Sequence, residues 1–462
     1  MAGFSFSHDP KKVETIESKY RKIVTPIPVP ESLPILEEMY KYESHSMHGQ
    51  LPMVWDYAED FLIGDAWGNQ WIDFTSTIFV ANAGHGNKRI QKALNEVINK
   101  PLMHTYTYAS KERAEYLKYL IDNTPQQFEK AFLLSAGTET TEAAIKLMRL
   151  NGIKQGKKRR GIICFDGAFH GRTMGAQMLS GNPSAKEWIG YHDPDIHHLS
   201  FPYEWLDEYK EDSANFFSIQ LQRLMDLKKL NPETDFCGIM LETFQGWGGI
   251  FYPDDFIEEI STFASENKLL VAFDEMQAGF GRTGKLFGYM HYNIEPDILC
   301  CGKGASSGMP LGIVLGSKEI MDLPDIGSMS STHSANPLSC VAGKANLKAL
   351  IEDKLIDNSN ILGEVLHKEL NLMQLQFPNH IKYIFGKGLL AGVVFQNNKG
   401  EPLASLCDSI AEMAFQRGLL IVHTGRESIK IGPPLSITEE ALMEGLNVFQ
   451  NCIADSINEL GL

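Results

Sequence analysis

This 462-residue sequence lacks the features of a membrane protein and of a disulfide-stabilised secreted protein. It contains no run of about 18 apolar residues, the length that a membrane-spanning helix needs. Its first stretch, MAGFSFSHDPKKVETIESKYRK, has no apolar segment of the kind found in signal peptides. The seven cysteines show no paired spacing, so we expect free, buried thiols and no metal site. We therefore expect a cytoplasmic protein that does not contact membranes.

The sequence also lacks an excess of basic residues. It has 42 Lys and Arg against 58 Asp and Glu, a formal net charge of −16. This balance argues against nucleic acid or an anionic membrane as the main partner. With 43% hydrophobic and 22% charged residues and no internal repeat, the composition is typical of a globular protein. A small-molecule site is fully compatible with these numbers.

The order of the apolar segments predicts the fold class. Residues 1–50 are polar and interrupted by prolines, and we interpret them as an N-terminal arm. From residue 127 onward, apolar runs such as GIICF and CGIML alternate with helical patterns. This alternation predicts an α/β fold, with a mostly parallel sheet flanked by helices. Residues 188–235 are polar and aromatic, so we expect them to lie outside the sheet.

Both ends of the chain contribute further elements. A hairpin is predicted within residues 61–74, where the sequence DAWGN marks the turn, and an amphipathic helix is predicted from about Asn87. After Pro337 a long helical pattern leads into three more strands and two helices. We divide the chain into an N-terminal arm with part of a small domain (1–80), a large domain (81–336) and the rest of the small domain (337–462).

The segment 269–310 places a carboxylate and a lysine at the ends of two apolar strands. Asp274 ends the first strand, and Lys303 follows the second. Ligands of open α/β sheets bind beside such strand ends. A buried ion pair is the alternative interpretation, although desolvation offsets most of the attraction in such a pair. A desolvated lysine is also a good amine nucleophile for carbonyl carbons.

The same segment contains GFGRTG at residues 279–284, which matches the dinucleotide pattern G-x-G-x-x-G. The context differs, because the preceding strand ends in an acid and Pro296 interrupts the helix that should follow. The next strand, ILCCG, also lacks the acid that binds a ribose. We therefore interpret this stretch as a loop.

Two other segments carry groups that fit a phosphate and a flat ring. Gly137 and Thr138 lie where a strand ends and a helix begins, so N–H groups and the helix dipole favour a phosphate there. Simple N-capping by Thr138 is the alternative. Phe169, in the loop after GIICF, could stack on a flat cofactor or belong to the core. Arg172 could bind a carboxylate as a planar fork or be structural.

Taken together, these groups match the requirements of one cofactor. Pyridoxal 5′-phosphate needs a phosphate site, a stacking ring, a carboxylate for its pyridinium nitrogen and a lysine for its aldehyde. None of the groups is specific alone, whereas the combination is.

From about residue 52 to its C-terminus, the chain resembles the class-III aminotransferases among the fold-type-I pyridoxal-phosphate enzymes. The stretch DEMQAGFGRTGKLFGYMHYNIEPDILCCGKG is similar to the family signature D-E-x-Q-x-G-x-G-R-T-G…E-P-D-I…K-G. The resemblance implies a large α/β domain, with a mostly parallel sheet flanked by helices, that binds the cofactor. It also implies a small α+β domain built from both termini.

The resemblance further implies roles for individual residues. Lys303 would be the Schiff-base lysine, and Asp274 the partner of the ring nitrogen. The remaining cofactor contacts would come from Gln277 (phenolic oxygen), Gly137 and Thr138 (phosphate), and Phe169 (stacking). The segment STHSANP resembles the family's S-T-x-x-x-N-P, in which the threonine reaches the phosphate of the other subunit's cofactor. Thr332 would therefore indicate a homodimer with shared sites.

Three positions depart from the pattern of ornithine- and 4-aminobutyrate-type enzymes. Trp247 replaces a glutamate that pairs with a switchable arginine, and Lys430 replaces that arginine. Lysine could bind a carboxylate only as a point charge, and Trp247 could equally be a packing residue. Ile78 stands where ornithine-type enzymes carry a tyrosine. These changes indicate a more apolar, roomier substrate site, with Arg172 as the candidate for binding an acidic tail.

The resulting hypothesis is an ω-aminotransferase with ping-pong kinetics. It would move the amino group of an ω-amino acid, amine or diamine to a small 2-oxo acid, pyruvate or 2-oxoglutarate, through Lys303. A racemase or epimerase, an aminomutase or an amino-phospholyase on the same scaffold is the alternative. A catalytically inactive interaction protein is a third hypothesis, against which the intact Lys303, Asp274 and Gln277 argue.

Overall fold

A seven-stranded sheet forms the centre of the large domain in the computed structural model, which describes residues 6–462. Its strands are parallel except β14, which runs antiparallel to both of its neighbours. The strand order is β6 (Lys130–Leu134), β14 (Gly312–Gly316), β13 (Ile298–Cys301), β12 (Leu270–Asp274), β9 (Phe236–Glu242), β7 (Gly161–Phe165) and β8 (Ile196–Leu199). The predicted α/β fold with a mostly parallel sheet is therefore confirmed.

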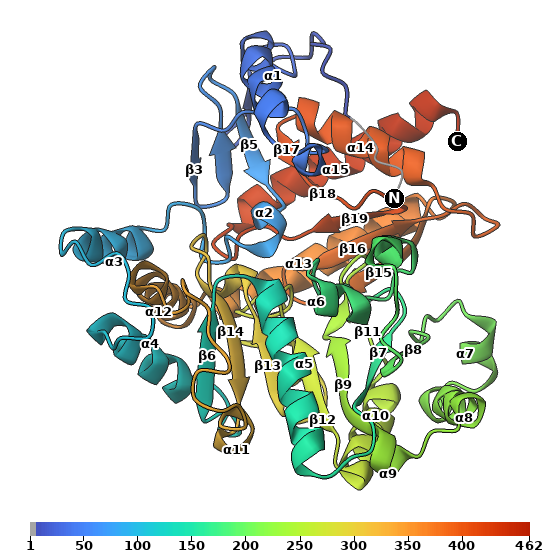
Figure 1. The fold of residues 1–462 in the computed structure, drawn as a ribbon. Helices are drawn as coiled ribbons and strands as arrows, with labels where there is room; N and C mark the ends of the chain where they lie inside the picture. Colours follow the sequence, from blue (N-terminus) through green and yellow to red (C-terminus); the bar gives the residue numbers. More distant parts are fainter. Residues whose placement is uncertain (1–5) are drawn as a thin grey trace.

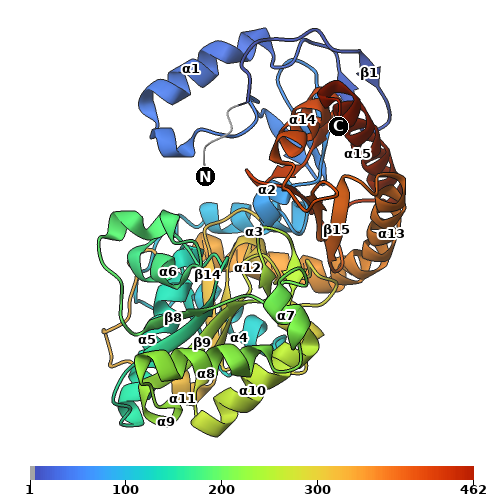
Figure 2. The same ribbon diagram turned by 90° about the vertical axis from the view of Figure 1, so that its right-hand side faces the viewer.

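The central strands are apolar, apart from the acids that end β9 and β12, because both faces of the sheet are covered. Successive residues of a strand point to opposite faces, and β12 illustrates this: Ala272 packs with the cluster around α5 (Gly137–Lys154), whereas Val271 and Phe273 join the cluster on the other face. That second face is covered by α8 (Phe216–Lys228) and α10 (Asp254–Asn267), as Figures 1 and 2 show.

The expectation that residues 188–235 lie outside the sheet is wrong in part. β8 is the edge strand of the sheet and pairs in parallel with β7. Its sequence, Ile-His-His-Leu, alternates burial, and His197 is among its buried residues. Because β8 contains two adjacent histidines, it does not form an apolar run that the sequence alone would reveal. Its burial becomes evident only from its pairing with β7. α8 also lies within this segment.

The small domain combines both ends of the chain, as predicted. β5 (Gln70–Asp73) pairs in parallel with β17 (Leu419–Leu420), so that N-terminal and C-terminal strands share a sheet. That sheet also contains β1 (Ile16–Glu17), β2 (Lys22–Ile23), β3 (Tyr57–Glu59) and β4 (Leu62–Gly64). A second, antiparallel sheet has the order β15 (Ile381–Gly386), β16 (Ala391–Phe395), β19 (Ser428–Ile431) and β18 (Val422–His423).

Three long helices accompany these sheets: α13 (Leu355–Gln376), α14 (Ala404–Gln416) and α15 (Glu439–Leu460). The hairpin of β4 and β5 and the helix α3 (Lys88–Ile98), which is capped by Asn87, confirm two local predictions. The division of the chain at residues 80 and 336 stays a prediction. α12 (Pro337–Glu352), just beyond the second boundary, packs against α3 and α4 (Lys111–Asp122).

The other elements are short. They are α1 (Leu33–Tyr42), α2 (Ser76–Phe79), α6 (Met174–Leu179), α7 (Asp207–Glu211), α9 (Pro232–Asp235), α11 (Lys318–Met321), β10 (Phe244–Gln245) and β11 (Ile250–Phe251). All seven cysteines are buried and free, as expected. Within residues 6–462, every helix is too short or too polar to cross a membrane.

A buried arginine joins the two domains. Arg282 lies in the loop formed by GFGRTG and is completely buried. Its guanidinium donates to the carbonyl oxygens of Leu389 (2.9 Å) and Pro433 (2.5 Å), to Ser76 Oγ (3.1 Å) and to Asn82 Oδ1 (2.7 Å). Burial lowers its pKa to about 9. The interpretation of GFGRTG as a loop is confirmed, because the stretch consists of turns and is followed only by the short 3-10 helix Gly288–His291.

Replacing this guanidinium should destabilise the protein strongly. We expect Arg282→Met to lower the free energy of unfolding by more than about 3 kcal/mol, because four buried acceptors lose a charged donor. Arg223→Met, on the exposed face of α8, is the matched control and should change it by less than about 0.5 kcal/mol. Urea unfolding of the three proteins measures both values, and equal effects of the two substitutions would contradict the prediction.

Candidate active site

The carboxyl ends of the parallel strands bring the predicted cofactor residues to one edge of the large sheet, where open α/β proteins bind ligands. There they line one cavity of about 270 Å³. Its walls are Gly137, Thr138, Phe169, His170, Gly171, Arg172, Glu242, Asp274, Met276, Gln277 and Lys303. Thus Arg172 and six of the seven predicted cofactor residues meet at one place; Thr332 is the exception.

Lys303 is separated from β13 by Gly302 and has a φ of 35°. A non-glycine residue in this left-handed region is strained, and such strain is concentrated at functional sites. Burial lowers the pKa of the Lys303 amine, while the carboxylates of Asp274 and Glu242 oppose that shift. A lowered pKa increases the neutral fraction of the amine, which is the nucleophilic form.

The Asp274 carboxylate is held by a histidine that our sequence analysis did not assign to the site. His170 Nδ1 lies 2.9 Å from Asp274 Oδ2, and Asp274 Oδ1 accepts from the Met276 N–H at 3.0 Å. Both side chains are buried. His170 Nε2 is also buried and has no hydrogen-bond partner among residues 6–462. In the sequence, His170 could have been assigned to the site because its polar ring lies next to Phe169, in the loop at the end of a parallel strand.

The predicted phosphate site lies at the beginning of α5. The alternative, N-capping by Thr138, is wrong, because Ala136 is the N-cap residue and the Glu139 carboxylate accepts the Ser135 and Ala136 N–H groups at 2.8 Å. Thr138 Oγ1 instead lies 2.7 Å from Thr173 Oγ1, beside the cavity. A Cβ at Gly137 would lie 2.5 Å from Met276 Sδ, so a larger residue at this position would require the Met276 side chain to move.

Phe169 and Arg172 form the outer part of the cavity. The Phe169 side chain is 46% exposed, so the alternative that it belongs to the core is wrong. The guanidinium carbon of Arg172 lies 5.5 Å from the centroid of the Phe169 ring, within cation–π range. Arg172 is exposed. The loop that follows β7 therefore places an exposed aromatic ring and an exposed cation side by side at the cavity.

Four predicted residues lie outside this cavity. Lys430 Nζ donates to the carbonyl oxygen of Gly246 (2.7 Å) and to Gln277 Oε1 (2.9 Å). Trp247 Nε1 donates to the Tyr203 hydroxyl (3.2 Å), and the Arg426 guanidinium lies 3.7 Å from the centroid of a Trp247 ring.

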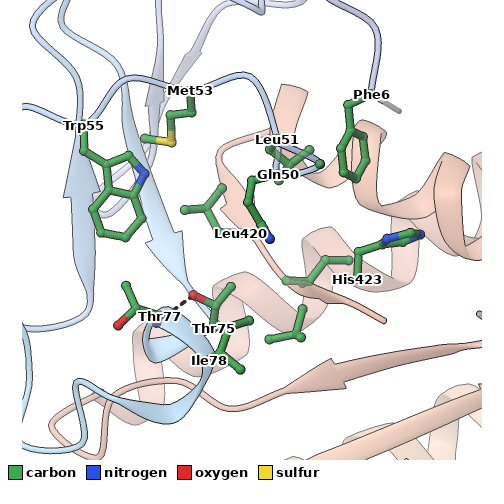
Figure 3. Close-up of a pocket in the computed structure, with 13 residues that line it drawn as sticks. Phe6, Gln50, Leu51, Met53, Trp55, Thr75, Thr77, Ile78, Leu420 and His423 are labelled. Carbon is green, nitrogen blue, oxygen red and sulfur yellow. Dashed lines mark hydrogen bonds between the residues drawn. The ribbon is translucent and has the colours of Figure 1, made fainter. Parts of the chain in front are cut away.

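The other two outlying residues are more exposed. Thr332 is exposed, and its carbonyl oxygen lies 2.8 Å from His104 Nε2. Ile78 lines a second cavity, of about 380 Å³, together with residues 49–51, Met53, Trp55 and residues 420–423. Figure 3 shows the labelled side chains of Leu51, Met53 and Leu420 around this space.

The turn α2, which carries Ile78, is left-handed. The four residues Ser76 to Phe79 have φ values of 47°, 52°, 59° and 65°, a conformation that costs roughly 1–2 kcal/mol per residue. Thr75 Oγ1 accepts the Thr77 N–H (Figure 3), and Ser76 Oγ donates to the Gly432 carbonyl oxygen at 2.7 Å. The completely buried Phe79 ring anchors the end of the turn.

The profile of the family described as Aminotransferase class-III matches residues 44–453, which is most of the chain. The chain belongs to the class-III aminotransferases. The mitochondrial acetylornithine aminotransferase of Saccharomyces cerevisiae is 29% identical over 400 residues, covering 85% of this chain and 89% of the relative. The alanine/serine racemase of Pyrococcus horikoshii is also 29% identical and covers 98% and 96%, respectively.

Among solved structures, the (S)-enantioselective omega-transaminase of Thermomicrobium roseum matches with a TM-score of 0.82 and 26% identity. The match covers 92% of this chain and 98% of the transaminase. Class-III aminotransferases depend on pyridoxal 5′-phosphate, and so does this enzyme. The cavity fits that cofactor: it combines a lysine amine, a buried carboxylate and a helix N-terminus with no side chain in the way at Gly137.

Glu242 is a second cavity residue that our sequence analysis did not assign. Burial raises the pKa of its carboxyl group to about 7, against the opposing effect of His170 and of the N–H groups of Phe169 (3.1 Å) and Gly246 (3.4 Å). The native state then binds more protons than the unfolded state between the ordinary carboxyl pKa and 7. Stability is therefore lost as the pH rises through this window.

Glu242→Gln should remove this loss. We compare the free energy of unfolding of this variant with that of the unmodified protein, both without cofactor. The difference in favour of the variant should grow by on the order of 2–3 kcal/mol between about pH 5 and about pH 8. Glu266→Gln, at an exposed position on α10, is the control and should show no such rise. Urea unfolding at several pH values provides the measurement, and a pH-independent difference for Glu242→Gln would contradict the assignment.

Proposed function

We propose that this class-III aminotransferase is an ω-aminotransferase. It moves the amino group of an ω-amino acid, amine or diamine to a small 2-oxo acid such as pyruvate or 2-oxoglutarate. The observation that carries the proposal is the meeting of Lys303 and Asp274 in one cavity, together with the mostly apolar second cavity at Ile78. In this proposal the first cavity carries out the chemistry, and the second cavity determines the substrate preference.

The residues of the first cavity would hold the cofactor as follows. Gly137 and Thr138 bind its phosphate, Phe169 stacks on its ring, and Gln277 bonds its phenolic oxygen. Asp274, held by His170, keeps a proton on the ring nitrogen. When bound, the cofactor withdraws the electron pair that is released from the amine-bearing carbon of the substrate.

Lys303 has two tasks in this scheme. Its amine would hold the cofactor at the aldehyde carbon and would give up that place to the amine of the donor. Once free, the Lys303 amine, whose pKa is lowered by burial, would accept the proton from the donor carbon and return it at the cofactor end, while water would supply the oxygen of the released oxo product. The oxo acid uses the same residues in the reverse direction, so donor and acceptor enter in turn, with ping-pong kinetics.

The side chain of the substrate would lie toward Ile78. Leu51, Met53, Trp55 and Leu420 line that cavity with it and favour an apolar chain (Figure 3). The exposed Arg172, at the mouth of the first cavity, is the candidate ligand for an acidic tail. A substrate role for Trp247 stays a prediction, and its contacts with Tyr203 and Arg426 equally support packing.

A homodimer is part of the proposal. The exposed Thr332 lies beside a segment with exposed apolar side chains: His104 Nε2 contacts the Thr332 carbonyl oxygen, while Met103, Tyr106 and Tyr108 are 53%, 39% and 79% exposed. Covering this surface with a second copy would place Thr332 near the partner's cofactor. A cytoplasmic location likewise stays a prediction.

A racemase is the second candidate, because the Pyrococcus racemase matches nearly the whole chain. The aminomutase and amino-phospholyase alternatives have no comparable support. A half-reaction separates transamination from racemisation, since only a transaminase keeps the amino group of the donor on its cofactor.

We expect an amine donor supplied alone to convert the bound cofactor to pyridoxamine 5′-phosphate, as read by the loss of its visible absorption band. Added pyruvate or 2-oxoglutarate should restore the band, and a panel of amines, diamines and ω-amino acids tested in this way identifies the preferred donor. Racemisation of alanine without conversion of the cofactor would overturn the proposal.

Lys303→Ala should reduce turnover by at least about 10⁴-fold, because both the nucleophile and the base are lost. The variant should retain the oligomeric state and melting temperature of the unmodified enzyme within a few degrees. Lys382→Ala, an exposed substitution on β15, is the control for turnover. Substantial activity of the Lys303 variant would refute its assignment.

A further inference from the structure

The Lys430 side chain leaves the small domain and ends against loops of the large domain. Its neighbours on β19, Ile429 and Ile431, are completely buried in the small-domain core, so alternation along the strand turns Lys430 to the other face. There its amine bonds Gly246 and Gln277 and lies 4.9 Å from the centroid of the Phe79 ring. Lys430 is only 5% exposed.

Gln277 is the partner whose orientation this contact decides. A carboxamide has an oxygen that accepts and an NH₂ group that donates, whereas a lysine amine held this way donates. Oε1 faces Lys430 in the structure, and against the protonated amine the flipped amide would set two donors against each other. Gln277 lines the cofactor cavity, and its Nε2 is the end that remains for that cavity.

Gly246 completes the arrangement from the other side. A Cβ on this residue would collide with Gln277 Nε2 and lie 2.7 Å from Glu242 Oε1. The backbone of Gly246 therefore approaches the amide closely and at the same time offers its carbonyl oxygen to Lys430. Both the direction and the position of the Gln277 side chain are thus constrained by this pair.

We propose that Lys430 is a positioning residue that fixes the Gln277 amide so that it donates a hydrogen bond to the phenolic oxygen of the cofactor. This inference deepens the proposed function and rests on its assignment of Gln277 to the cofactor. It replaces the predicted role of Lys430 as a ligand for a substrate carboxylate.

The environment of the amine agrees with this assignment. Burial lowers the pKa of Lys430 to about 7, and the nearby Lys303 amine acts in the same direction. An amine with a reduced charge, whose hydrogen bonds already go to Gly246 and Gln277, is a poor ligand for a substrate carboxylate. The substrate is then recognised without the ion pair that position 430 would otherwise supply.

The affinity of the cofactor-free enzyme for pyridoxal 5′-phosphate tests the proposal directly. We expect Lys430→Met to raise the Kd, measured by quenching of tryptophan fluorescence, about tenfold. Lys430→Arg keeps donors at the same position and should stay within about threefold of the unmodified enzyme. Lys382→Met, an exposed substitution in the same small-domain sheet, should leave the Kd unchanged.

A double-mutant cycle with Gln277 shows whether the two residues act together. Gln277→Leu should raise the Kd as much as Lys430→Met does, and the double variant should be no worse than Gln277→Leu alone. If Gln277→Leu leaves the Kd unchanged, the cofactor role in the proposed function fails. If it raises the Kd while Lys430→Met does not, only the role of Lys430 is overturned.

Substrate kinetics separate positioning from carboxylate binding. The pair 4-aminobutyrate and butylamine differs by one carboxylate, and with pyruvate as acceptor we expect Lys430→Met to change their KM ratio less than about threefold while lowering kcat for both. A selective rise of the 4-aminobutyrate KM would overturn the proposal. A lower melting temperature with an unchanged Kd would show a purely structural lysine and would also overturn it.

Discussion

A guanidinium that is completely removed from water needs buried acceptors, and Arg282 finds four of them, all outside its own loop. Two belong to the segment before α3, at Ser76 and Asn82, and two to the C-terminal half, at Leu389 and Pro433. The loop that carries Arg282 also carries Gln277. The same loop therefore carries both the buried charge that joins the two domains and the proposed cofactor ligand Gln277.

The active site concentrates ionisable groups that would each be unfavourable alone. Burial raises the pKa of Glu242 to about 7 and lowers that of Lys303, and it lowers that of Lys430 to about 7. Each shift reduces the charge that the fold must bury. Asp274 is supported differently, by His170 and by the Met276 N–H. Shifts of this kind are typical of sites that transfer protons near neutral pH.

Sequence patterns predicted the parts of this fold that depend on local information. The apolar runs of β7, β9, β12 and β13 indicated a doubly covered sheet. Parallel strands bring their carboxyl ends together, which is why Asp274 and Lys303 could be expected to line one cavity. β8 was missed because its coverage depends on β7. The contacts of Lys430 and Trp247 could not be foreseen, since they cross between domains and depend on how far each side chain reaches. The contact between His170 and Asp274 was not predicted, because the sequence does not show which carboxylate the His170 ring faces.

The left-handed turn Ser76–Phe79 restricts how this enzyme can diversify. Residue 78 has a left-handed backbone conformation, which glycine and asparagine adopt most easily. Substitutions there therefore change the folding stability together with the shape of the cavity. Variants selected at this position would be enriched in residues that favour the left-handed turn, regardless of their effect on substrate binding. Positions 51, 53 and 420, which line the same cavity from residues outside the turn, allow its shape to change without that selection.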